Sequence, residues 1–378
     1  MSKWPVVPLG EVCKPALHLE EPQGGILYRQ VGVRLWGEGA YERERIDGAS
    51  TKYTTFNRIE VDSLIVNKIW ARHGSVAVAT PELDGGYVSP EFPVYALDRD
   101  VIMPEWMRLI TKWHGFWEAC NQKAQGTSGK NRIKPREFLS IDIPLPSLVE
   151  QRSIIDKFGS LCDKSAQLES HLKSVESDAE TLLALSFRRW IAKAPYRPMR
   201  EVAPVEKRSV MLDSQRRYRE VGARSFGRGL FAKPDFNAGD ATWQKPVWIK
   251  AGDLVFSNIK AWEGAIALAG NECDGAIASH RYITCVPCGD LLGNFLLYYL
   301  LSSEGLEKVG EASAGTADRN RTLGLKRLEK IEVPVPPLAA QREFTALQST
   351  VSALKLRHKA IRENGAAIAA AALEKVFT

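Results

Sequence analysis

The most regular feature of the sequence is a run of mostly apolar positions that begins near Ile154. Its members recur at alternating spacings of four and three residues: Phe158, Leu161, Ser165, Leu168, Leu172, Val175, Ala179 and Leu182. This heptad spacing is typical of a helix that packs along its length against a partner helix. It predicts one helix over residues 149–190, which would be about 60 Å long at roughly 1.5 Å per residue.

A second and weaker seam of the same kind lies near the end of the chain, at Leu347, Val351, Leu354, His358, Ile361, Gly365, Ile368 and Ala372. His358 and Gly365 interrupt it, and a helical glycine costs about 1 kcal/mol relative to alanine. The two helices are each other's simplest partners. If a pseudo-twofold axis relates the two halves of the chain, they form an antiparallel coiled coil with a domain at each end. The alternative is that each helix folds back on its own domain, which such a narrow seam does not favour.

The chain also repeats itself at an offset of 190 residues. Tyr28-Arg-Gln-Val-Gly recurs as Tyr218-Arg-Glu-Val-Gly, and the segment that begins at Val61 recurs from Ala251. The match continues through Ile141-Asp-Ile-Pro-Leu-Pro, which recurs as Ile331-Glu-Val-Pro-Val-Pro. Solenoid repeats are only about 20–50 residues long. Each copy is therefore predicted to be a domain with its own core, followed by one of the long helices.

Each domain is predicted to be α/β (α+β). Residues 64–69 and 75–80 have the composition of short strands, with Gly74 turning between them. Pro104 opens a predicted helix of about 20 residues, because proline is tolerated at the first helical position; residues 291–309 supply its counterpart. Each domain closes on a strand ending in Pro-x-Pro, where proline removes a ladder donor. The predicted order is a domain at 1–147, a helix at 148–190, a domain at 191–337 and a helix at 338–378.

The composition is that of a globular protein, with 44% hydrophobic residues among 378. We find no signal-peptide pattern and no stretch near the roughly 18 apolar residues that a membrane span needs. The six cysteines are scattered, which fits a reducing, cytoplasmic compartment. The net charge of +6 favours a polyanionic partner, but only slightly, because many basic proteins bind no nucleic acid.

The doubled junction between each domain and its helix carries a family resemblance. A strand, Pro-x-Pro and Leu-x-x-Gln-Arg follow one another at Ile141–Arg152 and again at Ile331–Arg342. With Gly-Asp-Leu-Val-Phe-Ser at Gly252, and Gly-Thr at Gly126 and Gly315, this pattern resembles the specificity subunit of type I restriction–modification systems over nearly the whole chain. One departure is Ala340, which stands where the family usually has glutamate, as Glu150 does in the first copy.

The resemblance implies a subunit that recognises DNA without catalysing a reaction and without a cofactor. Each globular part would be a target-recognition domain that reads one half of a bipartite, asymmetric site in double-stranded DNA. The paired helices would act as a spacer and, with nearby surface, dock two methyltransferase subunits. The restriction (motor-nuclease) subunits would join through that assembly.

Three clusters are candidate DNA contacts. The first cluster follows the glycine-rich loops and consists of Lys130, Asn131 and Arg132 in one copy and Arg319, Asn320 and Arg321 in the other. It is a candidate because arginine pairs with guanine and asparagine pairs with adenine in the major groove. The second is the loop after the first repeated strand, where the copies differ within a matched frame: Lys68, Trp70, Arg72 and His73 against Lys260, Trp262 and Glu263. The plainer readings are a solvated turn or arginines that serve phosphates for the first cluster, and tryptophans that only pack for the second.

The third cluster is the basic stretch from Tyr196 to Pro234, which has ten Lys or Arg against four Asp or Glu. Its arginines include Arg216, Arg217, Arg219, Arg224 and Arg228, with a weaker echo in the first copy at Arg29, Arg34, Arg43 and Arg45. Phosphate contacts by such a stretch would make binding fall steeply with salt, although most charge runs are merely solvated. His280 and Arg281 complete the candidate set.

We find no catalytic constellation in the sequence. The Gly126-Thr-Ser-Gly-Lys-Asn segment lacks the spacing and the Ser or Thr of a phosphate loop. The motifs of amino-methyltransferases are also missing. Cys285 and Cys288, with Cys273 and His280 nearby, are a minor zinc hypothesis. Cys285 and Cys288 align with Tyr95 and Asp98 in the first copy, so the fold does not require them, and no metal is predicted.

Sequence-specific DNA recognition is therefore the leading hypothesis. The alternative is a protein–protein adaptor that carries two related binding domains on a coiled-coil spacer, with incidental basic charge. A nuclease is a third hypothesis, and it would require clustered carboxylates around a lysine, which we do not find.

Overall fold

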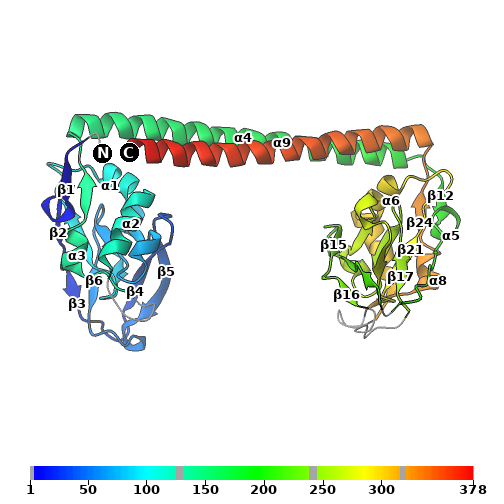
Figure 1. The fold of residues 1–378 in the computed structure, drawn as a ribbon, viewed down its shortest axis with the longest axis horizontal. Helices are drawn as coiled ribbons and strands as arrows, with labels where there is room; N and C mark the ends of the chain where they lie inside the picture. Colours follow the sequence, from blue (N-terminus) through cyan, green and yellow to red (C-terminus); the bar gives the residue numbers. More distant parts are fainter. Residues whose placement is uncertain (1–3, 125–130, 214, 238–244, 316–320, 378) are drawn as a thin grey trace. The chain divides into compact units, whose positions relative to one another are not determined.

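The computed structural model describes residues 4–124, 131–213, 215–237, 245–315 and 321–377 (Figure 1). The chain divides into two compact units, one formed by Met1–His171 with Lys359–Thr378 and the other by Leu172–His358. Two long helices, α4 (Leu148–Ile191) and α9 (Leu338–Phe377), contribute residues to both units. Among the described residues, no helix is long and apolar enough to cross a membrane.

The first unit is built on two small sheets that are mostly antiparallel. One sheet has the order β2-β10-β7-β8, the other has the order β3-β6-β9-β4-β5, and β1 pairs separately with β11. The predicted strands on either side of Gly74 are β7 and β8, and Gly74 has the positive φ of 73° that the turn requires. The strands are β1 (Val6–Pro8), β2 (Cys13–Pro15), β3 (Leu19–Glu20), β4 (Leu27–Val33), β5 (Ala40–Asp47), β6 (Phe56–Arg58), β7 (Leu64–Val66), β8 (Val76–Val78), β9 (Tyr87–Val88), β10 (Val94–Leu97) and β11 (Asp142–Pro144).

The helix predicted to start at Pro104 begins there, but the prediction of one continuous helix is wrong. The chain forms α1 (Pro104–Ile110) and α2 (His114–Lys123) instead, and α3 (Pro135–Leu139) follows. Between α1 and α2, Trp113 is extended, with φ −78° and ψ 128°. The indole of Trp117 donates to Thr111 O at 2.8 Å, so the aromatic residues that suggested one helix stabilise the break within it.

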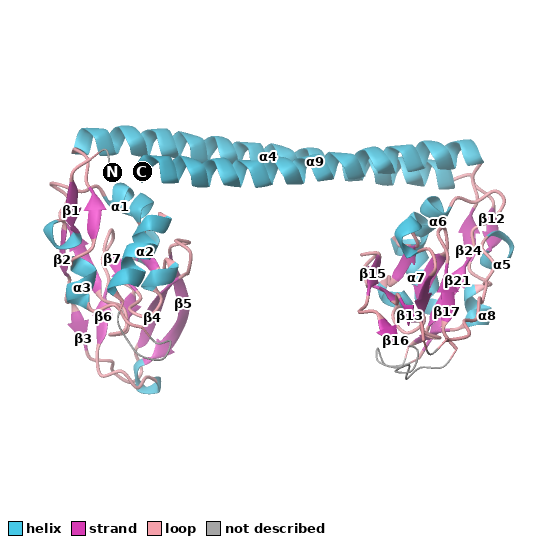
Figure 2. Cartoon of the chain, in the orientation of Figure 1, coloured by secondary structure: helices cyan, strands magenta, loops and turns pink. Residues whose placement is uncertain are grey.

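The second unit repeats this plan with shorter strands (Figure 2). Its central sheet has the order β19-β18-β21, and Leu254 of β18 pairs with Leu268 of β19 as Leu64 of β7 pairs with Val78 of β8. The strands are β12 (Tyr196–Pro198), β13 (Arg217–Tyr218), β14 (Val221–Ala223), β15 (Leu230–Ala232), β16 (Phe236–Asn237), β17 (Val247–Ile249), β18 (Leu254–Ser257), β19 (Ile266–Leu268), β20 (Ala276–Ala278), β21 (Tyr282–Cys285), β22 (Ser313–Ala314), β23 (Thr322–Leu323) and β24 (Glu332–Pro334).

The helix predicted at residues 291–309 is also two helices, α6 (Gly293–Leu300) and α7 (Ser303–Ala312). Ser302 caps α7, and its hydroxyl accepts from Gly305 N at 3.2 Å. Gly305 lies so close to the Tyr299 carbonyl that a Cβ there would overlap it. Two shorter helices, α5 (Met199–Val202) and α8 (Leu325–Leu328), complete this unit. A break at the same place in both copies supports the duplication.

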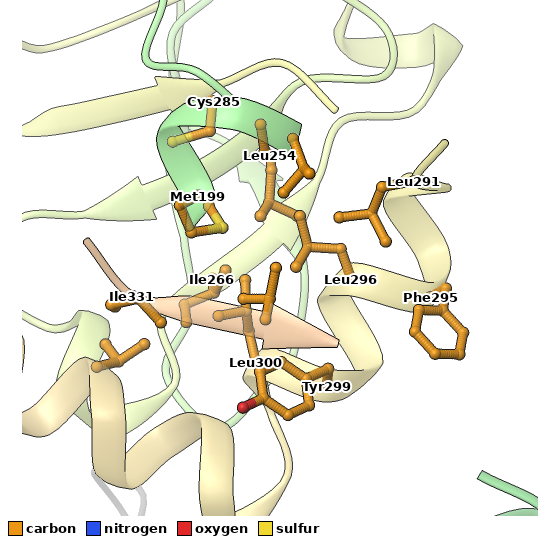
Figure 3. Close-up of a cluster of buried hydrophobic side chains, with 14 of the residues drawn as sticks. Met199, Leu254, Ile266, Cys285, Leu291, Phe295, Leu296, Tyr299, Leu300 and Ile331 are labelled. Atoms are coloured by element: carbon orange, nitrogen blue, oxygen red, sulfur yellow. The ribbon is translucent and has the colours of Figure 1, made fainter. Parts of the chain in front are cut away.

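The core of the second unit gathers side chains from the sheet, the paired helices and the Pro-x-Pro strand. Figure 3 shows Leu254 and Ile266 from the sheet close to Leu296 and Leu300 of α6, with Ile331 beside them. Phe187 of α4 and Phe344 of α9 belong to the same cluster, with ring centroids 5.0 Å apart. The long helices therefore begin or end on the core of the domain.

The two long helices are partners of each other, as predicted. In the second unit, Nδ1 of His358 lies 2.9 Å from the Glu176 carboxylate, and Lys355 pairs with Glu180, so the chain directions oppose. In the first unit, Arg362 donates to Glu169 at 2.8 Å. The alternative, in which each helix packs only on its own domain, is wrong, because these pairs join α4 to α9.

The predicted seam is correct at some positions of the long helices and wrong at others. On α4, Leu172 is buried, but Leu182 is 55% exposed and its neighbour Leu183 is 7% exposed. Glu169 and Glu176 face the partner helix in place of the predicted Leu168 and Val175. On α9, Ile361 and Ile368 are likewise exposed. The sequence pattern selected apolar residues. In the structure, Arg362 and His358 of α9 lie opposite Glu169 and Glu176 and pair with them, which allows those carboxylates to lie in the seam.

The two long helices start differently, because Glu150 of α4 is replaced by Ala340 in α9. Ser147 precedes α4, its N–H donates to Glu150 Oε2 at 3.0 Å and its hydroxyl accepts from Glu150 N at 3.4 Å. This reciprocal pair is a capping box. The equivalent positions before and within α9 are Pro337 and Ala340, which cannot form it. The second helix instead starts from a proline, which needs no partner for an N–H.

Candidate DNA interface

The guanidinium groups of Arg29 and Arg219 each donate to two backbone carbonyls of their own domain. The guanidinium of Arg29 donates to Glu82 O at 2.8 Å and also to Asp84 O. That of Arg219 donates to the equivalent carbonyls, Glu272 O at 3.0 Å and Asp274 O at 2.7 Å. Each arginine closes the turn between two strands of its domain. We therefore remove both from the set of proposed DNA contacts.

Arg34 and Arg224 occupy equivalent exposed positions at the ends of strands β4 and β14. Each guanidinium stacks on an aromatic ring of the paired strand, at 4.6 Å from the Tyr41 centroid and 5.0 Å from the Phe231 centroid. Arg228 lies over the Phe226 ring at 5.6 Å. Stacking orients these groups without neutralising them, so their charge remains available to a phosphate.

In the first unit, the loop after β7 joins two of the predicted clusters. Glu91 Oε1 lies 4.0 Å from Lys68 Nζ and 3.4 Å from Arg132 Nη1, which brings the loop and the end of the glycine-rich segment together. The backbone agrees, because Ile133 N donates to Lys68 O at 2.9 Å. Asn131 is half-buried beside Arg132.

The same loop carries an aromatic side chain at the surface. Trp70 is 44% exposed, and its ring centroid lies 5.6 Å from that of His73. Arg72 Nε lies 3.2 Å from His73 Nε2, so these side chains form one cluster on the 3₁₀ turn Ala71–His73. Lys68, Trp70, Arg72, His73 and Arg132 are hereafter called the first contact surface.

The second unit places different chemistry in the same frame. Trp262 receives two cations on its ring, Lys260 at 5.6 Å and Arg321 at 5.0 Å. Glu263 takes the position of His73; its carboxylate accepts from Lys260 at 2.8 Å and from Ser225, and its pKa is lowered, mainly by the hydrogen bond from Lys260. Lys260, Trp262, Glu263 and Arg321 are hereafter called the second contact surface. Lys130, Arg319 and Asn320 lie outside the described residues.

His280 and Arg281 take the positions of Pro90 and Glu91 in the first unit. Both are exposed, and His280 lines a cavity of about 330 Å³ with Asn258 and Lys207. The equivalent cavity of the first unit, about 340 Å³, is lined by Pro90, Leu17 and Lys68. Glu91, whose carboxylate lies near Lys68 and Arg132 in the first unit, is thus replaced by Arg281 in the second.

Sequence reasoning missed Trp36 and Phe226, which lie one residue before Gly37 and Gly227. Both are exposed and both have a positive φ, 59° and 62°. The signal was present in the sequence, since Trp-Gly-Glu-Gly and Phe-Gly-Arg-Gly match at the offset of 190. Charge does not mark these two positions, because neither side chain carries one.

The cysteines of the zinc hypothesis do not form a cluster. Burial raises the pKa of the Cys285 thiol to about 12, and this side chain packs in the core of its domain. Cys288 is exposed and its thiol contacts backbone carbonyls of α5. Within the described part of the chain, no three His, Cys, Asp or Glu side chains are grouped to hold a metal ion.

Comparison with solved structures places this geometry in a known fold. The HsdS subunit from Thermoanaerobacter tengcongensis superposes with a TM-score of 0.61 at 20% identity, over 99% of this chain and 96% of that chain. This is the HsdS fold. A chain from a study of complex assembly and conformational transition of the type I R-M system gives a TM-score of 0.66 at 19% identity, over 99% of this chain and 97% of that chain. No protein-family model and no curated protein matches the sequence.

The likeness to HsdS covers both globular parts and both long helices of the chain. It therefore includes the two contact surfaces, whose backbone frames agree and whose side chains differ. In such a fold, the same backbone carries Arg72 and His73 in one domain and Trp262 and Glu263 in the other.

Proposed function

We propose that this chain is the DNA-specificity subunit of a type I restriction–modification enzyme. Each domain binds one half of a bipartite, asymmetric site in double-stranded DNA. The observation that carries the proposal is the full-length HsdS fold combined with two equivalent contact surfaces of different charge. Groove recognition depends on the pattern of donors and acceptors on the side chains, so unlike surfaces on a common frame suit unlike half-sites.

The proposed domain limits follow the junctions between the globular parts and the helices. Residues 1–147 and 191–337 form the two recognition domains, and residues 148–190 and 338–378 form the spacer helices. The chain itself carries out no reaction; methylation and cleavage belong to its partners. Such a subunit works where the DNA of the cell is, in the cytoplasm, and all six cysteines are free thiols, as suits that compartment.

The partners are two methyltransferase subunits, through which the restriction (translocase) subunits join. An exposed apolar stripe on the helices supports docking. In the second unit, Val175 and Leu182 are one heptad apart on α4 and are 46% and 55% exposed, with Leu185 beside them. In the first unit, Ile361 and Ile368 of α9 are spaced in the same way and are also exposed. Apolar residues grouped in this way at a surface are typical of a protein interface.

The experiment is a salt titration of DNA binding by the complex purified with the methyltransferase encoded beside this gene. Specific binding to duplex DNA, with log K falling linearly as log salt rises, supports the proposal. An adaptor would show no specific binding to duplex DNA and no steep dependence of binding on salt. That result would contradict the proposal.

A matched pair of variants tests docking separately. Leu182→Glu places a charge in the exposed stripe, whereas Ser177→Glu places one on an exposed position of α4 that faces away from it. We expect Leu182→Glu alone to reduce co-purification of the methyltransferase, with unchanged unfolding of the isolated chain. Equal recovery with both variants would remove the stripe from the interface.

A further inference from the structure

An aromatic ring stands at the tip of one β-hairpin in each unit. Trp36 follows strand β4 and is 57% exposed; Phe226 follows strand β14 and is 72% exposed. The two positions are related by the repeat offset. Neither ring belongs to a core cluster of its domain. Burial in the core of the domain therefore does not explain why both copies have a large apolar side chain here.

The backbone at both rings is held in an unusual conformation. Trp36 and Phe226 have φ values of 59° and 62°, a region that side chains with a Cβ rarely adopt. Trp36 N donates to His73 O at 2.7 Å, and Phe226 N donates to Glu263 O at 2.8 Å. A second bond follows in each unit, from Gly37 N to Gly74 O and from Gly227 N to Gly264 O. These bonds fasten each hairpin tip to the loop that carries a contact surface.

In the first unit, the ring of Trp36 continues the row of rings on the contact surface. Its centroid lies 5.4 Å from that of His73 and 6.0 Å from that of Trp117. His73 in turn contacts Trp70. The rings of Trp36, His73 and Trp70 thus follow one another on this surface, and Arg72 and Arg34 lie in the same two loops.

In the second unit, the ring of Phe226 stands more nearly alone. Arg228 stacks on it, and Ser225 next to it donates to Glu263 at 3.0 Å. Phenylalanine has no hydrogen-bonding group, so the exposed ring of Phe226 can offer a partner only apolar or stacking contact. Arginines at Arg224 and Arg228 flank it on both sides along the chain, which gives the tip the charge that a polyanion attracts.

We propose that Trp36 and Phe226 are base-contacting side chains, each making apolar contact with the bases of the half-site bound by its domain, while the flanking arginines contact phosphates. This inference rests on the proposed function. Apolar contact with base edges and partial insertion at a base step are both established modes for exposed rings, and both depend on base identity or stacking. A fixed backbone suits this role, since the ring loses little freedom on binding.

The test compares Phe226→Ala with Arg224→Ala in the complex with its methyltransferase. The probes are a duplex carrying the methylated site mapped for the wild-type complex and a duplex of equal length with that site scrambled. We expect Phe226→Ala to weaken binding to the mapped site about 5- to 30-fold, with little change on the scrambled duplex and the same salt slope. Arg224→Ala should weaken both and flatten the slope. Phe226→Tyr, which keeps the ring, should retain most of the affinity.

Equal weakening on both duplexes, a changed salt slope or wild-type affinity for Phe226→Ala would overturn the inference. Trp36→Ala is the parallel variant in the first unit. The Trp36 ring contacts Trp117, so Trp36→Ala could also lower the melting temperature. In that case the binding data for Phe226→Ala, which alters a more exposed side chain, decide whether the inference holds. If the wild-type complex shows no preference for any mapped site, the proposed function fails instead, and the two failures are thus distinguishable.

Discussion

Gln151 and Gln341 make the same three backbone hydrogen bonds in their two units. Gln151 accepts from Met103 N at 2.8 Å and donates to Val101 O and Pro146 O, both at 2.9 Å. Gln341 accepts from Leu292 N at 2.8 Å and donates to Asp290 O and Pro336 O at 2.6 and 2.7 Å. Both side chains are fully buried. Each glutamine thus ties the first turn of a long helix to the loop that precedes the first short helix of its domain.

Replacing either glutamine by alanine should destabilise its unit. Gln151→Ala leaves the Met103 N–H and the carbonyls of Val101 and Pro146 without their side-chain partner, and we expect a loss of about 1–3 kcal/mol in the free energy of unfolding. Arg152→Ala, at the exposed neighbour, is the control and should stay within about 0.5 kcal/mol of the wild type. Urea unfolding followed by circular dichroism measures both. Similar midpoints for the two variants would show that the junction does not depend on these bonds.

The corrected helix seam makes a prediction for two adjacent leucines. Leu183→Ala removes a buried side chain that packs near Phe187, so we expect a loss of about 2–4 kcal/mol. Leu182→Ala alters an exposed side chain and should change stability by less than about 0.5 kcal/mol. Thermal unfolding of the isolated chain distinguishes them. The opposite order would restore the seam that the sequence pattern suggested.

Two arginines of the basic stretch should behave differently. Arg219→Ala loses two hydrogen bonds to backbone carbonyls and should lower stability by about 1 kcal/mol, with an unchanged salt slope of DNA binding. Arg224→Ala should leave stability nearly unchanged and reduce the slope of log K against log salt by about 1, since one phosphate contact is lost. A reduced slope for Arg219→Ala would return that residue to the interface.

The cysteines should react in two classes. Burial raises the pKa of the Cys13 and Cys285 thiols to about 12, so these groups remain protonated at pH 8 and gain thiolate only as the pH approaches that value. Cys162 and Cys288 are exposed. Iodoacetamide at pH 8 should therefore modify Cys162 and Cys288 in the folded chain, and Cys13 and Cys285 only in denaturant. Peptide mass spectrometry after a short exposure reads the sites, and rapid labelling of Cys285 in the folded state would refute its burial.

The repeat, the two long helices and the strands around Gly74 could be predicted from the sequence because each depends on local pattern. The heptad spacing places α4 within a residue or two of its observed bounds, Leu148 and Ile191. The break between α1 and α2 could not be predicted in this way. It depends on Trp117 reaching back to Thr111, a contact that the apolar pattern of a continuous helix also accommodates.

The sequence could suggest which arginines are candidates for the interface, but it could not show which of them are engaged by the backbone of their own domain. Charge identified Arg34 and Arg224, but it identified Arg29 and Arg219 equally, and only the positions of the Glu82 and Glu272 carbonyls separate the two pairs. The seam shows the same limit, because whether Leu182 or Leu183 faces α9 depends on the rotation of the helix. Register and side-chain partners are properties of tertiary contacts, which a single sequence constrains weakly.

The proposed division of one DNA site between two unlike domains can be tested most directly by mapping methylated bases across a genome. The complete operon would be expressed in a host without DNA methylation of its own, and modified positions read by single-molecule sequencing. The account predicts one bipartite motif with two different half-sites at a fixed spacing. A contiguous motif, a palindrome, or no motif in the presence of an active methyltransferase would contradict it.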